Sequence, residues 1–432
     1  MIKITDKQII NSLKAGAVPA LGCTEPVACA LAAARAKEEL GSTPDKIEVK
    51  VSGNIFKNGM GVGIPGTGAC GLYIASALGA VCGKTEYGLE VLKEVSLGNN
   101  LELAKKMVDE KKVKISIKED VDDKLYVETI STLGKDVVKV VIKKAHTNII
   151  LVEKNGKVIY QKDLGALGNQ NTSEDCIEMD YTVERIWKFI NEVDIEDIKF
   201  LLEGVKMNKH ISDAGLTGNY GLKIGYTIKK NIEKGILGND FLTQTLMMTS
   251  AASDARMDGF ESPVMTNSGS GNQGITVYLP VYSAYLFFKA DEDKLIRALA
   301  LSNLIAEHVH SFMGHLSALC GINIAAMGAA CGITYILGGD LSKINNTIKT
   351  MASNLTGMMC DGAKLGCSLK VYSGVSAAVQ AALLSMSEVT TNNDGIIDSC
   401  IEKTIKNVGI IASEGMEVTD KTILKIMTSK IC

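Results

Sequence analysis

The sequence has almost no excess of charge of either sign. Lys and Arg number 46 against 49 Asp and Glu in 432 residues, which gives a formal net charge of -3. Proteins that hold nucleic acid or an anionic membrane by electrostatics carry a basic patch or stripe. The composition therefore argues against both partners and favours a small-molecule ligand.

The sequence also lacks a long apolar run and a leader-like start. Stretches such as CGLYIASALGAVCG are shorter than the roughly 18 residues that span a bilayer and contain several glycines. The first residues, MIKITDKQII, have neither the basic stretch nor the apolar core of a secretory signal peptide. We therefore expect a cytoplasmic protein with no membrane partner.

Cysteine is abundant, but it does not occur in the tight pairs typical of structural zinc sites. The 11 cysteines include no Cys-x2-Cys pair. An odd number in a reducing compartment suits metal ligands, reactive thiols or core residues better than a disulfide framework. Apolar neighbours predict that five of them are buried core residues: Cys29, Cys70, Cys82, Cys331 and Cys400.

The spacing of apolar residues divides the chain into helical and extended parts. Helices are expected over residues 7–14, 26–41, 89–94 and 101–112, and from about Tyr181 to the end. Alternation predicts strands in KIEVKVSG, VKISI, KLYVETIST, VVKVVIKK, NIILVEK and KVIYQK, with a turn at Asn155-Gly156. We predict an α+β fold with a mostly helical domain of residues 1–44 and 181–432 and an inserted α/β sheet domain of residues 45–180.

Three cysteines beside glycines are candidate metal ligands. Cys320 precedes Gly321, and Cys360 and Cys367 flank the segment DGAKLG. Glycine lets the backbone approach a bulky inorganic cluster and leaves amide N–H groups free to point at sulfur. The spacing fits iron, while zinc and plain structural cysteines stay open as alternatives.

Five motifs in consistent order then resemble a known family. They are GCTEP at 22–26, SGNIFKNGMGVGIPGTG at 52–68, SGSGNQGI at 268–275, LSALCG at 316–321 and CDGAKLGCSLK at 360–370. Together they resemble the L-cysteine desulfidase family, which is related to the catalytic part of the iron–sulfur L-serine dehydratases. The resemblance covers nearly the whole chain.

The resemblance implies an oxygen-sensitive 4Fe-4S cluster held by Cys320, Cys360 and Cys367, with Cys23 as the catalytic proton acceptor. It also implies a reaction that converts L-cysteine and water to pyruvate, ammonia and hydrogen sulfide without pyridoxal phosphate. Three protein thiolates on four irons leave one iron without a protein ligand, where a substrate thiolate can bind. The helical domain would then bind the cluster and carry catalysis.

Two residues are candidates for the base that removes the α-proton. Cys23 stands at a predicted helix start, where N–H groups and the helix dipole favour an anion, so we expect its pKa to fall below the ordinary value of about 8.5. Glu25 is the alternative base, or else a helix cap. In a distant stretch, SDARMDG, the residues Asp254, Arg256 and Asp258 are expected to form an ion-pair turn and are assigned no chemistry.

Two polar, glycine-rich stretches are expected to be loops that bind the carboxylate and amino groups of the substrate. The tentative binding residues in SGNIFKNG and NSGSGNQG are Asn54, Lys57, Asn58, Ser268, Ser270, Asn272 and Gln273. Neither stretch has the spacing of a dinucleotide fingerprint or a P-loop. Tight turns or helix N-termini are the alternative interpretation of both.

Several other side chains receive weaker predictions. His308 and His315 suit a hydrogen-bond donor or acid better than a metal ligand, and a Schiff-base role for Lys364 is not expected. The terminal Cys432 is a hypothetical labile fourth ligand of the cluster.

Three other functions stay open from the sequence. The protein could be an L-serine dehydratase, an iron–sulfur redox or sensor protein, or a structural zinc protein. Gly/Ala/Met-rich segments also permit a homodimer.

Overall fold

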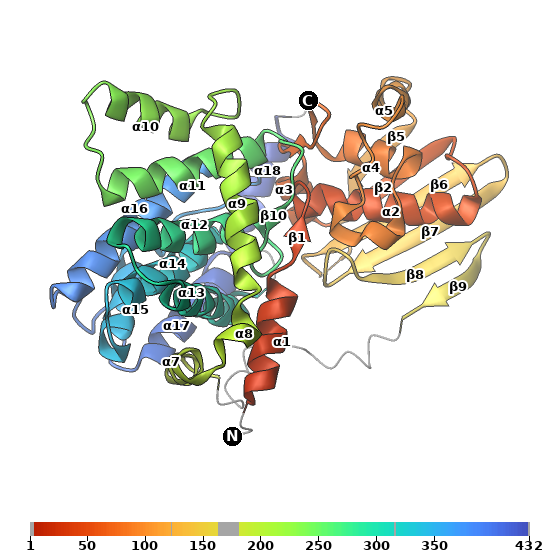
Figure 1. Cartoon of the computed structure of the whole chain (residues 1–432). Coiled ribbons are helices and arrows are strands. Elements are labelled where there is room, and N and C mark those ends of the chain that lie inside the picture. The colour runs from red at the N-terminus through yellow and green to blue at the C-terminus, as the bar shows by residue number, and fades with distance from the viewer. Residues whose placement is uncertain (1–3, 122, 163–180, 315–316, 431–432) are drawn as a thin grey trace.

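The computed structural model describes residues 4–121, 123–162, 181–314 and 317–430, and it separates a helical part from a part built on a sheet (Figure 1). Helices account for 58% of the described residues, and the large sheet has six strands of mixed direction. The predicted α+β fold is confirmed.

The large sheet has the strand order β5-β2-β6-β7-β8-β9. Its strands are β2 (Lys46–Val51), β5 (Val113–Ile117), β6 (Tyr126–Leu133), β7 (Asp136–Lys143), β8 (Ile149–Lys154) and β9 (Lys157–Gln161). Strand β2 runs parallel to β5, and every other pair is antiparallel. Asn155 and Gly156 have φ values of 52° and 78°, as the predicted two-residue turn between β8 and β9 requires.

Helices α2 (Thr24–Leu40), α4 (Leu72–Val81) and α5 (Asn100–Asp109) cover the sheet and share a core with it. A Cβ atom on Gly79 would lie 2.1 Å from the carbonyl oxygen of Ala30, so glycine allows α4 to approach α2 closely. Helix α1 (Asp6–Gly16) packs instead with the helical core. Helix α1 therefore belongs to the helical core and α2 to the core of the sheet. The predicted domain boundary lies later, at residue 44.

The helical part is built around α14 (Ile322–Ile336), which contacts four other helices. The helices of this part, besides α14, are α7 (Val183–Glu192), α8 (Ile195–Ile198), α9 (Leu201–Gly215), α10 (Ile224–Glu233), α11 (Phe241–Met257), α12 (Gly271–Phe288), α13 (Glu292–Met313), α15 (Leu341–Leu355), α16 (Cys367–Met386), α17 (Ile401–Ile410) and α18 (Glu417–Thr428). A Cβ on Gly328 of α14 would lie 2.2 Å from the carbonyl oxygen of Ser302 on α13. Small residues therefore let these helices pack closely, as their sequences predict.

Helix α16 differs from the expectation that no segment is apolar enough to span a membrane. Within the described ranges it is the one helix that is long and apolar enough to cross a membrane. Its mean hydropathy is 1.2, and half of its apolar stretch is buried inside the protein. A core helix of a globular protein passes the same test. Its outer face exposes Leu369, Tyr372, Leu383 and Leu384.

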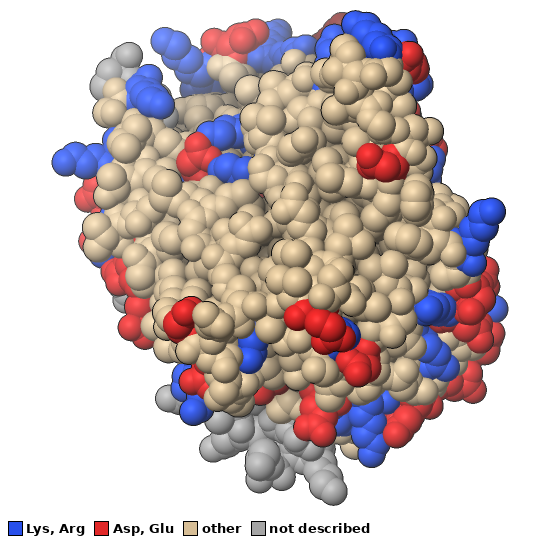
Figure 2. All heavy atoms as spheres, turned by 90° about the vertical axis from the view of Figure 1, so that its left-hand side faces the viewer, with Lys and Arg blue, Asp and Glu red and all other residues tan. Residues whose placement is uncertain are grey.

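The side of the molecule on which α16 lies, at the left of Figure 1, carries few charged groups (Figure 2). This surface would suit a second copy of the chain, and the homodimer stays a prediction.

Three expectations are corrected by the structure. SGNIFKNG was expected to be a loop, but it forms helix α3 (Gly53–Gly59), in agreement with the alternative of a helix N-terminus. The Ser52 hydroxyl caps this helix by accepting a hydrogen bond from the Ile55 N–H at 3.4 Å. Residues 85–90 form a 3-10 turn, where a helix was predicted over 89–94. Cys70 and Cys400 are exposed, although the sequence predicts them in the core.

Short strands complete the fold near the junction of its two parts. Strand β1 (Pro19–Ala20) pairs with β10 (Val264–Met265), and β3 (Gly63–Ile64) pairs with β4 (Ala69–Cys70). The first pair joins the segment before α2 to the segment between α11 and α12. It thereby sets the start of α2 beside the start of α12.

Candidate active site

A cavity of about 380 Å³ lies between the two parts of the fold, and four cysteines line it: Cys23, Cys320, Cys360 and Cys367. Cys23 precedes α2, Cys320 lies just before α14, Cys360 follows α15, and Cys367 begins α16. Three segments far apart in the sequence, the last of which carries both Cys360 and Cys367, therefore meet at one place. The structure thus brings together the three predicted cluster ligands and the predicted base.

The segments of Cys320 and Cys360 are joined by backbone hydrogen bonds. The Cys320 N–H donates to Met358 O at 2.9 Å, and the Cys360 N–H donates to Ala318 O at 2.6 Å. The two thiols are themselves hydrogen-bonded, and that contact lowers the pKa of Cys360 while burial opposes it. The same contact, together with burial, raises the pKa of Cys320, so the pair holds one thiolate more readily than two.

Cys367 occupies the first position of α16, where helix N–H groups favour a negative sulfur. Its Sγ lies 3.7 Å from the carbonyl oxygen of Gly362. Burial raises its pKa, although the hydrogen bond from the Lys364 backbone lowers it. Cys367 also packs in a small cluster with Cys23 and Met257, so the third thiol lies near the proposed base.

The three thiols fit an iron–sulfur cluster better than a single metal ion. Within the described ranges, no three His, Cys, Asp or Glu side chains converge as ligands of one ion would. A cluster has several metal corners, so its thiolates need not point at one atom. The glycines near these cysteines allow close packing: the Gln273 side chain lies against Gly321, and the Lys57 carbonyl lies against Gly362, whose φ of 97° favours glycine.

Cys23 is the N-cap residue of α2, as predicted, but its thiol is not acidic in this environment. Burial raises the pKa of Cys23 to about 11, although the positive charge of Arg256 lowers it. The expected fall in pKa is therefore wrong for the protein without its cluster. Desolvation of the thiolate outweighs its stabilisation by Arg256.

Arg256, which the sequence analysis assigned no chemistry, lines the cavity beside Cys23. Its side chain is 6% exposed and donates to Gly22 O at 3.0 Å. The expected ion-pair turn does not form among the described residues, because Asp254 accepts from the Gly225 N–H and Asp258 from the Gly221 N–H. The sequence did contain a sign that Arg256 is unusual, because it is the one basic residue in the small-residue segment TSAASDARM. Every position of this segment is buried in the structure.

Glu25 and Asn58 meet at the same cavity. The Asn58 side-chain amide donates to Glu25 Oε1 at 3.1 Å, and both residues line the cavity. Thr24 also donates to Glu25 at 3.3 Å. Glu25 is therefore close enough to the cavity to serve as the alternative base.

The polar residues around the start of α12 also line the cavity. They are Ser268, Ser270, Asn272 and Gln273. Ser270 is the N-cap of α12, and its hydroxyl accepts from the Gln273 N–H at 3.5 Å. The stretch is thus a helix N-terminus, the alternative that the sequence left open. Gln273 packs over Gly321, where a Cβ would lie 2.5 Å from its side-chain nitrogen.

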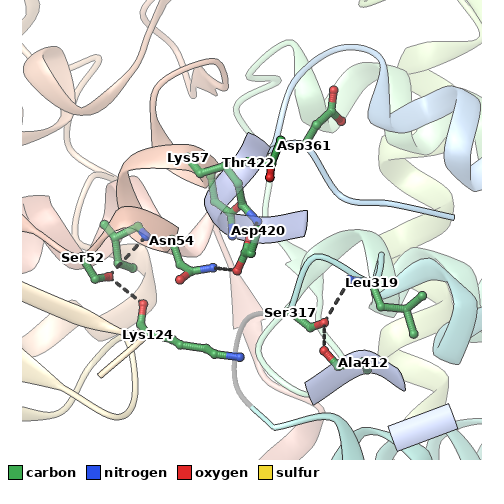
Figure 3. A network of polar contacts seen from close by, with 12 residues as sticks. Ser52, Asn54, Lys57, Lys124, Ser317, Leu319, Asp361, Ala412, Asp420 and Thr422 are labelled. Carbon is green, nitrogen blue, oxygen red and sulfur yellow. Dashed lines mark hydrogen bonds and ion pairs between the residues drawn. The ribbon is translucent and has the colours of Figure 1, made fainter. Parts of the chain in front are cut away.

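Asn54 and Lys57 do not line this cavity; they bind the C-terminal helix instead. Figure 3 shows both side chains of α3 directed at Asp420 of α18. The Asn54 amide donates to Asp420 Oδ2 at 2.6 Å, and the Lys57 ammonium pairs with Oδ1. Lys57 still acts on the site at a distance, because its charge lowers the pKa of Cys360.

The segment before Cys320 is anchored in a similar way. The Ser317 hydroxyl donates to Ala412 O at 2.5 Å and accepts from the Leu319 N–H at 2.9 Å (Figure 3). This serine therefore ties the Cys320 segment to residues 411–415, the turn that leads into α18.

The remaining predicted residues have structural partners or fall outside the description. His308 bonds to Glu402 at 2.7 Å and does not line the cavity, whereas His310 does line it. Lys364 pairs with Asp361. His315 and Cys432 lie outside the described residues.

Comparison with known proteins identifies the family. The model of the serine dehydratase alpha chain matches residues 86–425. The chain belongs to the serine dehydratase alpha chain family. It is also 47% identical over 434 residues to a UPF0597 protein of Parabacteroides distasonis, with 100% of both chains covered. A UPF0597 protein of Phocaeicola vulgatus is 45% identical over 428 residues, covering 99% of this chain and 98% of the relative.

Family membership narrows the chemistry that the cavity serves. The family is that of the iron–sulfur serine dehydratases, so a lyase of this type and an iron–sulfur cofactor are supported. The three thiols of the cavity suit that cofactor. The names of the relatives specify no substrate.

Proposed function

We propose that this protein is an iron–sulfur lyase that converts L-cysteine and water to pyruvate, ammonia and hydrogen sulfide. The observation that carries the proposal is the meeting of four cysteines around one cavity, three of them in glycine-flanked segments and one at a helix N-terminus. Three thiols would hold a 4Fe-4S cluster, and the fourth would be free for proton transfer.

Cys320, Cys360 and Cys367 would hold the cluster, which would supply a Lewis-acidic iron without a protein ligand. Lys57 and Lys370 would stabilise the bound thiolates, because both charges lower the pKa of Cys360. The proposal involves no pyridoxal phosphate.

Cys23 would take the α-proton of the substrate on its Sγ. Elimination then breaks the bond between the β-carbon and sulfur, releases sulfide and leaves aminoacrylate, which water converts to pyruvate and ammonia. Because burial raises the pKa of Cys23, only a small fraction of this thiol is ionised, but the thiolate that forms is a strong base. The charge of Arg256 favours the thiolate. Glu25, held by Asn58, is the second candidate base.

L-Serine is the second candidate substrate, because the matching family model is that of a serine dehydratase. The two substrates differ in one atom of the leaving group, and a soft thiolate matches iron in a sulfur-rich site better than a hydroxyl does. This preference supports L-cysteine.

The redox-protein alternative needs neither a cavity nor a separate base, whereas this chain has a cavity lined by two candidate bases, Cys23 and Glu25. All nine described cysteines are free thiols, which suits the cytoplasm that we propose as its compartment.

Anaerobic purification followed by assays of sulfide and pyruvate tests the proposal. We expect sulfide and pyruvate in equal amounts from L-cysteine and slower release of pyruvate from L-serine. Cluster absorbance without turnover of either amino acid would overturn the lyase.

Iron content tests the proposed ligands independently. Cys320→Ala, Cys360→Ala and Cys367→Ala should each lose iron and acid-labile sulfide. Cys331→Ala is the matched control, since Cys331 is fully buried in α14 and does not line the cavity. Equal iron in all four variants would refute the assignment.

A further inference from the structure

Arg256 is a buried cation without an anionic partner. No Asp or Glu of the described ranges forms an ion pair with it. One terminal nitrogen donates to Gly22 O, the other lies 3.6 Å from Met257 Sδ, and Nε has no hydrogen-bond partner. Buried charges are normally paired, because their desolvation is costly. The unused donor therefore indicates a ligand that supplies negative charge.

The guanidinium lies on the first turn of α12. A Cβ on Gly271 would be 2.3 Å from Arg256 Nε and 2.6 Å from Cζ. Only a glycine at this position lets the guanidinium reach the helix start. The two residues after the N-cap Ser270 are Gly271 and Asn272, whose N–H groups have no acceptor within the helix.

A helix N-terminus and a guanidinium are complementary to the same kind of ligand. The N–H groups and dipole of α12, which is 18 residues long, attract an anion, and an arginine binds a carboxylate through charge-assisted hydrogen bonds. Both lie at the cavity that holds the four cysteines. An amino-acid substrate in that cavity carries one carboxylate.

We propose that Arg256 and the N-terminus of α12 bind the α-carboxylate of the substrate. The inference rests on the proposed function for the identity of that substrate. Arg256 also touches Cys23, so a carboxylate on the guanidinium would bring the neighbouring α-carbon close to the proposed base. Arg256 is thus a substrate-binding and positioning residue.

Calorimetry on the anaerobically purified, cluster-loaded protein tests the site with two thiol probes. 3-Mercaptopropionate carries the carboxylate and lacks the amine, whereas cysteamine carries the amine and lacks the carboxylate. Arg256→Gln should weaken 3-mercaptopropionate binding about 10- to 100-fold, as expected for a lost hydrogen-bonded charge, and leave cysteamine binding unchanged. Arg256→Lys should recover part of the lost affinity for 3-mercaptopropionate, because lysine keeps the positive charge but cannot form the two parallel hydrogen bonds of a guanidinium.

Two further variants guard against a purely structural effect. Gly271→Ala keeps the charge but displaces the guanidinium, so it should also weaken 3-mercaptopropionate binding selectively, even if Arg256→Gln does not fold. Arg297→Gln is the matched control: this guanidinium donates to the carbonyls of Ile190 and Val193, outside the cavity. It should leave both probes unaffected.

The outcomes separate this inference from the proposed function. Equal weakening of both probes by Arg256→Gln and Gly271→Ala, or no weakening by either, overturns the carboxylate site even if L-cysteine is turned over. Selective loss of 3-mercaptopropionate binding in a protein that turns over neither L-cysteine nor L-serine supports the carboxylate site and overturns the lyase.

Discussion

The ion pair between Lys57 and Asp420 should hold the C-terminal helix on the rest of the protein. Lys57 is 1% exposed and Asp420 is 15% exposed. Helix α18 has no fully buried residue, and its other main attachment is Leu424, which packs where Gly53 lacks a side chain. Loss of the Asp420 charge would leave the Lys57 ammonium buried and unpaired while α18 stays docked.

The burial of Lys57 determines the expected magnitude. Removal of one partner from a buried pair costs about 3–5 kcal/mol, whereas an exposed pair contributes about 0–1 kcal/mol. Because Asp420 is partly exposed, we expect the lower end, about 3 kcal/mol, for Asp420→Asn. The loss should appear as local opening of α18, since an opened helix lets Lys57 reach water.

Amide hydrogen exchange of residues 417–428 measures this opening. Asp420→Asn should accelerate exchange there about 100-fold, the factor that about 3 kcal/mol implies. Lys57→Met in the same background should recover part of the protection, because it removes the unpaired charge.

A matched control lies on the same helix. Glu417→Gln removes a pair with Lys421, whose side chains are 60% and 74% exposed, and should change exchange by less than about fivefold. If Asp420→Asn accelerates exchange no more than this control does, the buried pair does not hold α18 and the reasoning is refuted.

Three other predictions concern the base, the acid stability and the packing of α2. Cys23→Ala should retain its iron and lose sulfide release by at least about 100-fold, the lower range for a general base; retained turnover would move the base elsewhere. Burial raises the pKa of Glu307, so the native state binds its proton more tightly than the unfolded state, and stability should fall as the pH rises through the native pKa. Urea denaturation at a series of pH values gives the free energy of unfolding. In Glu307→Gln this free energy should depend less on pH around the native pKa of Glu307, and an unchanged pH dependence would contradict the raised pKa. Gly79→Ala should destabilise by about 1–3 kcal/mol through its clash with α2. In the same urea titration Gly415→Ala, whose added Cβ has no neighbour closer than 3.7 Å, should change little.

Local pattern was sufficient for the strands and most helices. Alternating apolar residues predicted all six strands of the large sheet, because a half-buried strand must alternate. SGNIFKNG was missed because its two glycines oppose a helix locally, whereas the Ser52 cap and burial against the rest of the protein stabilise one. Propensity is a weak guide where tertiary contacts decide.

Some residues of the candidate site could be found from the sequence, and others only from the fold. Motifs identified the cysteines, Asn58 and the start of α12, and all of these line the cavity. Arg256 escaped because its sequence neighbours, Asp254 and Asp258, offered a local ion pair, and only the fold shows those carboxylates bonded to other backbone groups. Asn54 and Lys57 looked like ligand donors because their partner, Asp420, is more than 360 residues away in the sequence.

The sequence by itself determined the fold class, the strands and the cysteine-bearing segments, because each follows from local residue patterns. Only the tertiary structure decided that Cys23 is a weakly acidic thiol, since burial outweighs the effect of Arg256, and that Arg256 lines the cavity with no carboxylate partner among the described residues. Desolvation depends on what surrounds a group in space, and the order of residues along the chain does not specify those surroundings.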